Sequence, residues 1–182
     1  MKLIIGLGNP GKNHAITRHN AGFLCIDYLQ KAWHFGTFQL NQKMSGEISE
    51  SNVGKEKVLL VKPDTFMNAS GTTVSQLVHF YKITPEDIMV IHDDLDIASG
   101  TYKVTSSSRA AGHNGVSDVI EKLGTQDFPR IRLGIGRPVA VSGACMPSHD
   151  FVLQNFSKEE LVTLSALFPA VKDELHKWLR VA

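Results

Sequence analysis

Two short apolar runs stand out in the pattern of hydrophobic and polar positions. Lys2–Leu7 is closed by glycines, and Asp87–Ile91 is almost entirely apolar. Runs of this length, bounded by turn-forming residues, are typical of strands buried on both faces of a sheet. Shorter or mixed patterns predict four more strands, at Ser45–Ser51, Lys57–Val61, Thr101–Thr105 and Arg130–Ile135.

Apolar residues at helical spacing predict four helices. The first begins after Asn20, which is a suitable N-cap residue. The last is long and amphipathic, and Pro169 predicts a kink in it. The four are Ala21–Trp33, Ala69–Lys82, Asn114–Leu123 and Lys158–Leu179.

Loops of distinct composition separate these elements. Asn52–Gly54 predicts the turn between the second and third strands, and Pro63 opens a loop over Lys62–Asn68. Small residues fill Ser106–Gly112. The stretch 138–149 is also rich in small residues, and we expect a mobile loop there.

Strands alternate with helices along the 182 residues, without an internal repeat or a linker. This order predicts one α/β domain over residues 1–182, with a mixed, largely parallel central sheet flanked by helices. We expect Lys2–Leu7 and Asp87–Ile91 to be central strands. Ligands in such sheets bind beyond the carboxyl ends of the strands, so polar residues there are candidates for function.

The composition is that of an ordinary globular protein, with 42% apolar and 20% charged residues. The net charge is only +1, so any contact with RNA must come from a local basic patch. Cys25 and Cys145 match no zinc or redox spacing, which favours a reducing, cytoplasmic setting. The N-terminal apolar run is too short for a signal peptide, and no segment approaches the length of a membrane span.

One glycine pattern is misleading. Gly6–Gly11 reads G-x-G-x-x-G directly after a strand, as dinucleotide-binding sites do. Such a site needs a helix that begins inside the glycine turn, whereas here polar residues intervene before the helical pattern starts. Asp27 is at a suitable distance but lies inside the first helix. A tight Asn-Pro-Gly turn is the better interpretation.

Polar side chains gather at the ends of the predicted elements. If the strands are neighbours, five such clusters converge on one rim of the sheet. The clusters are Asn9, Arg18-His19-Asn20, Phe66-Met67-Asn68, His92-Asp93-Asp94 and His113-Asn114.

Together these side chains suit general acid–base catalysis. Histidine takes up a proton near neutral pH, a carboxylate can fix its tautomer, and amides can donate to a developing oxyanion. Each cluster also has a simpler interpretation. His113 or Asn68 could cap the following helix, and the aspartates after His92 could form a solvated turn. Cys25 lies on the apolar face of the first helix, where a small core residue is expected.

Taken in order along the chain, six segments resemble the bacterial peptidyl-tRNA hydrolase family from end to end. A single segment would be a weak match, but six in the right order are specific. They are Gly6–Gly11, Thr17–Gly22, Lys62–Gly71, His92–Asp96, Gly112–Gly115 and Arg132–Gly136.

The resemblance implies a hydrolase that cleaves the ester between a stalled peptide and its tRNA. His19 is similar to the family's catalytic base, and Asp93 to the carboxylate that orients it. Asn9 matches the residue that distinguishes a blocked amino end from a free one. Asn68 and Asn114 match amides that bind substrate near the scissile ester.

The resemblance also implies contacts with the tRNA 3′ end and acceptor stem. Phe66 and Met67 resemble walls for the terminal adenosine or the peptide, and His113 lies in the substrate-binding segment. Lys103 and Arg132 fall where the family carries basic residues that meet tRNA phosphates. The family fold is one α/β domain, usually monomeric, that needs no cofactor and no metal.

Three positions depart from the family pattern. His14 stands where tyrosine is usual, and an imidazole can still stack or hydrogen-bond. Ser106–Ala111 replaces a glycine-rich run, and because alanine tolerates a positive φ poorly, we expect a different loop path. Thr105 replaces a phosphate-binding lysine, and Arg109 can supply the missing charge nearby.

Two other functions stay open. One is an RNA-binding module that has kept the fold and lost the reaction, although the intact polar clusters argue against it. The other is a metallohydrolase that uses His92, Asp93, Asp94 and His113, although these residues lack the helical spacing of a zinc site. Activity in the presence of a chelator would decide against the second.

Overall fold

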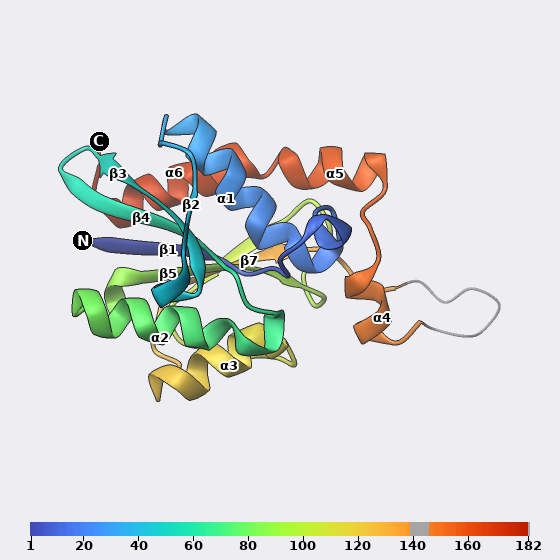
Figure 1. The fold of residues 1–182 in the computed structure, drawn as a ribbon. Helices are drawn as coiled ribbons and strands as arrows, with labels where there is room; N and C mark the ends of the chain where they lie inside the picture. Colours follow the sequence, from blue (N-terminus) through green and yellow to red (C-terminus); the bar gives the residue numbers. More distant parts are fainter. Residues whose placement is uncertain (139–145, 182) are drawn as a thin grey trace.

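A seven-stranded mixed sheet forms the centre of the computed structural model, which describes residues 1–138 and 146–181 (Figure 1). The strand order is β2-β3-β4-β1-β5-β7-β6. The central pairs β4-β1, β1-β5 and β5-β7 are parallel, and the outer pairs are antiparallel. The strands are β1 (Lys2–Gly6), β2 (Gln39–Asn41), β3 (Gly46–Val53), β4 (Glu56–Pro63), β5 (Ile88–Asp94), β6 (Tyr102–Thr105) and β7 (Arg130–Gly134).

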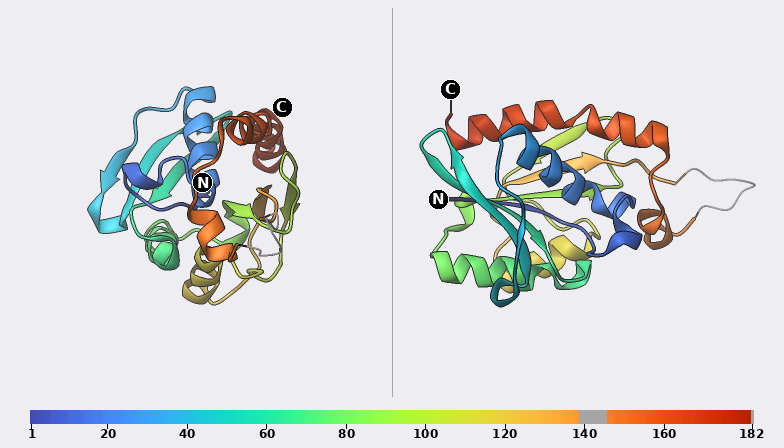
Figure 2. Two further views of the ribbon diagram at one scale, coloured as in Figure 1. Left: turned by 90° about the vertical axis from the view of Figure 1, so that its right-hand side faces the viewer. Right: turned by 45° about the horizontal axis from the view of Figure 1, so that its top comes forward.

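Helices cover both faces of the sheet (Figures 1 and 2). One apolar cluster joins α1 and α6 to one face, and a second joins α2 and α3 to the other. The α-helices are α1 (Ala21–Ala32), α2 (Ser70–Tyr81), α3 (Asn114–Leu123), α4 (Ser148–Leu153), α5 (Lys158–Ser165) and α6 (Phe168–Leu179). Short 3-10 turns include η1 (Lys12–His14), η2 (Arg18–Asn20), η3 (Gln42–Met44), η4 (Met67–Ala69) and η5 (Pro85–Asp87).

The architecture confirms the prediction of an α/β fold with a mixed sheet that is parallel at its centre. β1 lies between β4 and β5, and β5 lies between β1 and β7, so both apolar runs are central strands. Their apolar side chains are buried on both faces, which is the environment that selects such runs. In the described part of the chain, no helix is long and apolar enough to cross a bilayer.

Several predicted boundaries are wrong. β5 runs to Asp94, so its polar end lies within the strand and not after it. β4 continues through Pro63, which shortens the predicted loop, and the hairpin turns at Gly54–Lys55. The backbone bonds of the sheet override local composition at both places, because each added pair satisfies buried peptide groups.

The C-terminal region also differs from its prediction. Two helices, α5 and α6, replace the single kinked helix. The helical conformation is interrupted just before Pro169, which occupies the first turn of α6. β2 and α4 were not predicted, since each is too short for a clear periodicity. The predicted loop 138–149 lies mostly outside the described residues, and its last two residues begin α4.

The start of α1 packs closely against the sheet. A Cβ on Gly22 would collide with the carbonyl oxygen of Ile91 and the backbone of Leu7. Only glycine therefore allows the helix to approach β1 and β5 so closely. This contact places His19, in the turn before α1, beside the end of β5.

Candidate active site

His19 and Asp93 form a hydrogen-bonded pair at the carboxyl end of β5. The Nδ1 atom of His19 lies 3.0 and 3.1 Å from the two carboxylate oxygens of Asp93. Because an ionised carboxylate only accepts hydrogen bonds, Nδ1 carries the proton and donates it. The Nε2 atom of His19 therefore has the free lone pair.

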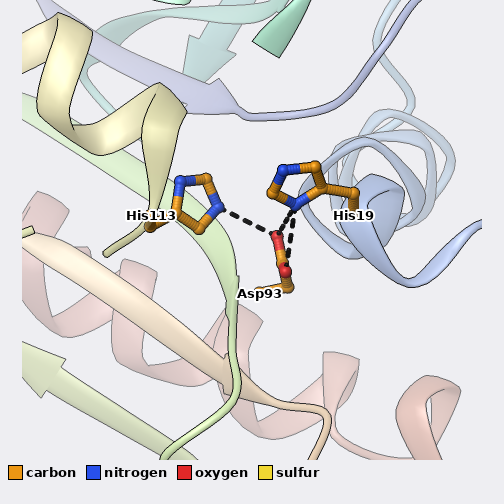
Figure 3. A group of neighbouring side chains, drawn as sticks. All are labelled: His19, Asp93 and His113. Atoms are coloured by element: carbon orange, nitrogen blue, oxygen red, sulfur yellow. Dashed lines mark hydrogen bonds and ion pairs between the residues drawn. The ribbon is translucent and has the colours of Figure 1, made fainter. Parts of the chain in front are cut away.

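A second imidazole binds the same carboxylate from the other side (Figure 3). The Nε2 atom of His113 lies 3.0 Å from Oδ1 of Asp93, and its Nδ1 accepts the backbone N–H of Val116 at 3.2 Å. The amide fixes the His113 tautomer with the proton on Nε2. Asp93 thus accepts two N–H bonds, one from each face of the sheet edge.

Asp93 is held as a carboxylate despite being only 1% exposed. Burial by itself would raise its pKa, but the charges and hydrogen bonds of His19 and His113 lower the pKa well below the usual value. The site therefore carries a fixed negative charge that can support a positive charge forming on an imidazole.

Among the described residues, one group of side chains lies close enough together to hold a metal ion. It consists of His19, Asp93 and His113. Apart from Nε2 of His19, the side-chain nitrogen and oxygen atoms of the trio take part in hydrogen bonds within the protein. For Nε2 of His113 to bind a metal, its proton would have to move to Nδ1, where it would oppose the N–H of Val116. The arrangement fits a proton-holding network better than a metal centre.

The four residues of the predicted metal alternative do not form one group of possible ligand atoms, although His92 and Asp93 both lie beside His113. His92 donates through Nδ1 to the carbonyl oxygen of Asp93 at 2.7 Å. Asp94 accepts from Nε of Arg132 at 2.7 Å and from the backbone of Asp96. Nδ1 of His92 and the carboxylates of Asp93 and Asp94 are all hydrogen-bonded within the protein, so these four side chains are not arranged as one metal centre.

Asn9 is clamped beside the His19 segment. Its backbone N–H donates to Oδ1 of Asn20 and its carbonyl accepts from Nδ2 of the same side chain. Its own Oδ1 accepts the N–H of Met67 at 2.8 Å. No hydrogen bond among the described residues engages the Nδ2 atom of Asn9, so this donor is free to meet a ligand.

Asn20 does not act as predicted. It occupies the N-cap position of α1, but its side chain makes no capping bond. Both amide atoms are used on the backbone of Asn9. In contrast, His113 does cap α3, as one interpretation predicted, and it binds Asp93 with its other nitrogen.

A cavity of about 350 Å³ opens beside the histidines. Its walls come from β5, the start of α3, and α4. They include His19, Asp93, His113, Asn114, His149 and Val152. The free lone pair of His19 is thus carried by a residue that lines an open space large enough for part of a substrate.

Other predicted site residues lie in or beside η4 and at the start of α3. Phe66 is 63% exposed, and its ring lies edge-on to that of His14 with the ring centres 6.5 Å apart. Asn68 and Asn114 are exposed at the starts of their helices. Met67 is buried in the core, where its sulfur lies against Gly115 at the start of α3.

The predicted basic residues lie on the edge formed by β7 and β6. Lys103 and Arg132 are opposite each other in the antiparallel pair, so both side chains lie on one face. Arg132 is already paired with Asp94. Arg109 is exposed on the neighbouring loop, and its carbonyl oxygen accepts a hydrogen bond from Arg130.

Arg130 was missed by sequence reasoning. It is 1% exposed, and its guanidinium donates to the carbonyl oxygens of Ser108 and Arg109. It thereby fixes the loop that leads to His113. A charged residue at the start of a predicted strand was the available signal, because an arginine that becomes buried there needs partners.

The loop before His113 takes a strained path. Ala111 has φ of +50° and is followed by Gly112 at +82°. Ala111 therefore adopts the positive φ that alanine tolerates poorly. The bonds from Arg130 and the capping of α3 by His113 hold the loop there at a cost of about 1–2 kcal/mol.

The buried imidazole of His92 makes the free energy of unfolding depend on pH. Burial and the nearby His113 lower its pKa well below the ordinary value, and its Nε2 has no hydrogen-bond partner within residues 1–138 and 146–181. The unfolded chain takes up this proton near pH 6.5 while the folded chain does not. We therefore expect the free energy of unfolding to fall as the pH falls below about 6.5, by up to roughly 1.4 kcal/mol per unit from this group.

Urea denaturation between pH 7.5 and 5 measures the effect. The variant His92→Asn keeps a donor for the Asp93 carbonyl and cannot titrate. Its stability should decline less steeply than that of the wild type. Parallel curves for the two proteins would contradict the prediction.

Comparison with known proteins decides the family. A family model described as peptidyl-tRNA hydrolase matches residues 3–182. The chain belongs to the peptidyl-tRNA hydrolase family. It is accordingly an enzyme of the hydrolase class, as the six sequence segments predicted.

Individual relatives agree. The peptidyl-tRNA hydrolase of Desulfitobacterium hafniense (strain Y51) is 48% identical over 167 residues, which cover 92% of this chain and 86% of that protein. That of Bacillus cereus (strain Q1) is 44% identical over 179 residues, covering 98% and 93%. The crystal structure of the Acinetobacter baumannii enzyme has a TM-score of 0.84 at 32% identity, covering 93% and 83%.

Proposed function

We propose that the protein hydrolyses the ester between the peptide and the tRNA in peptidyl-tRNA, releasing free tRNA and peptide. The observation that carries the proposal is the His19–Asp93 pair, which leaves the lone pair of His19 Nε2 on a residue that lines the cavity. Family membership supports the substrate, and the geometry supports the role of each residue.

The reaction begins with water. His19 Nε2 takes a proton from a water molecule as the oxygen attacks the ester carbonyl, and Asp93 stabilises the imidazolium that forms. The amides of Asn114, which lines the cavity, and of Asn68 are the proposed donors to the oxyanion. As the tetrahedral intermediate collapses, the imidazolium returns the proton to the departing ribose oxygen.

Asn9 gives a physical reason for preferring a blocked amino end. Its Oδ1 is occupied by the N–H of Met67, so only the Nδ2 donor can face a substrate. The carbonyl oxygen of a peptide or N-acyl group can accept from this donor. A free α-ammonium group is itself a donor and cannot.

The decisive experiment compares N-acetyl-aminoacyl-tRNA with the unblocked aminoacyl-tRNA. We expect rapid release of tRNA from the blocked substrate only. The reaction is run with and without a chelator, and the proposed mechanism requires equal rates. Salt-sensitive tRNA binding without release would instead show the RNA-binding module, and loss of activity in the chelator would show the metallohydrolase.

The proposed partner is the acceptor stem and 3′ end of tRNA, and we propose that the enzyme acts in the cytoplasm as a monomer without a cofactor. The acceptor stem is A-form, so its phosphates are the natural targets of basic side chains. Lys103, Arg109 and Arg132 form the proposed patch. Since the net charge is +1, such a patch has to act locally.

Lys103→Ala tests the patch. It should weaken tRNA binding and reduce the slope of log affinity against log salt by about one, because one phosphate contact is lost. Fluorescence titration over a range of salt concentrations measures both quantities. Lys31→Ala, in the last turn of α1, is the control. Equal slopes for the two variants would remove Lys103 from the interface.

A further inference from the structure

Arg18 connects the catalytic turn to the opposite wall of the cavity. It directly precedes His19 in η2 and is buried. Its Nη2 atom lies 2.9 Å from both carboxylate oxygens of Glu160 in α5. The guanidinium also stacks on Phe151 of α4, 4.2 Å from the ring centre, and its Nη1 reaches the Phe151 carbonyl oxygen at 3.4 Å.

Backbone bonds join the same two segments. The N–H of Arg18 donates to the carbonyl oxygen of Gln154, and the N–H of Phe156 donates to that of Ile16. Thr17 and Asn155 form an isolated antiparallel bridge between them. The segment that follows α4 is therefore paired with the residues just before His19, and the views show α4 beside that turn (Figure 2).

Glu160 serves two partners at once. Besides binding Arg18, it accepts the N–H of Ser157 at 2.7 Å and completes the capping box of α5. A carboxylate fixed in this way is a rigid partner for a planar guanidinium. The ion pair thus ties the α4–α5 connection to η2.

Arg18 matters for the site because α4 forms one wall of the cavity. Ser148, His149 and Val152 line it from α4, and His19 lines it from η2. We infer that Arg18 is a positioning residue that holds α4 at a fixed distance from His19, so that the cavity keeps the width needed to bind the acyl end of the substrate. The inference rests on the proposed function.

The geometry separates substrate binding from chemistry. The His19 ring is oriented by Asp93, and the turn that carries it is held by the clamp between Asn20 and Asn9. Neither contact involves Arg18. Loosening Arg18 should therefore displace α4 and raise KM, while the base keeps its orientation and kcat changes little.

Two conservative variants test this role. Arg18→Lys keeps the charge but loses the bidentate fork and the stacked plane. Glu160→Gln removes the ion pair while glutamine still completes the capping box. We expect each to raise KM about tenfold with kcat within about twofold of wild type. Glu174→Gln, which breaks the exposed pair with Lys177 on α6, is the matched control and should change neither.

Hydrogen exchange supplies a readout that does not depend on activity. In both variants the amides of residues 148–156, including that of Phe156, should exchange about tenfold faster, while those of β5 exchange as in wild type. The double variant should exchange no faster than either single one, because both remove the same link.

Each outcome decides the inference. Unchanged exchange in α4 would show that Arg18 does not hold it. Faster exchange with unchanged KM would overturn the positioning role, and a fall in kcat at constant KM would mean that Arg18 acts on His19 itself. A wild-type protein that releases no tRNA would overturn the proposed function, and the exchange data would still decide whether Arg18 anchors α4.

Discussion

Replacing His19 by alanine should lower kcat for N-acetyl-aminoacyl-tRNA by about 10²–10⁴-fold, because general base catalysis contributes that much to such reactions. The Nε2 atom of His19 bears the one free lone pair of the His19–Asp93–His113 network. Without it, water must lose its proton to solvent as it attacks. Single-turnover release of tRNA measures the effect on the chemical step.

If His19 is the general base, the His19→Ala variant should still fold and bind tRNA. Salt-sensitive tRNA affinity and the far-UV spectrum of His19→Ala should match those of the wild type. His79→Ala, at an exposed position of α2, controls for loss of an imidazole elsewhere. A rate of His19→Ala equal to that of this control would refute the mechanism.

Asp93→Asn should also lower kcat strongly, by about 10³–10⁴-fold, although it replaces only one oxygen by an NH₂ group. The carboxylate accepts N–H bonds from His19 and His113 at once. Asparagine offers one oxygen and one NH₂ group, so an N–H of one imidazole would face another donor. His19 then turns to the tautomer with the proton on Nε2, where it cannot accept one from water.

The loss in Asp93→Asn should appear in kcat and not in tRNA affinity, because Asp93 is buried beneath the histidines. Imidazole ¹⁵N shifts would report the change of tautomer directly. Asp173→Asn, at an exposed position of α6, is the control. A variant that keeps both the wild-type tautomer and the wild-type rate would show that Asp93 does not orient His19.

The central elements could be predicted from sequence because burial on both faces demands uninterrupted apolar runs. β1 and the apolar part of β5 carry that pattern, whereas α1 and α3 could be predicted from apolar residues at helical spacing. The positions at which these elements end were predicted less accurately. β5 extends through His92 and Asp93 because pairing with β7 satisfies the backbone, whatever the polarity of the side chains.

The roles of individual polar residues depended more strongly on tertiary contacts. Asn20 has the right composition for a helix cap, yet its amide is used on Asn9 from a different segment. Arg18 and Arg130 show no periodic signal, and each is defined by partners distant in sequence. His92 belongs to the same polar cluster as Asp93, but its imidazole is buried away from the cavity.

The sequence by itself determined the α/β class, the two central strands and the five polar clusters, because these follow from local periodicity and from residue chemistry. Only the tertiary structure decided which atoms meet. It placed Asp93 between two imidazoles and fixed their tautomers, and it used Arg18 to tie α4 to the catalytic turn. Hydrogen-bond direction and distance are properties of side chains brought together from separate segments, and no local pattern encodes them.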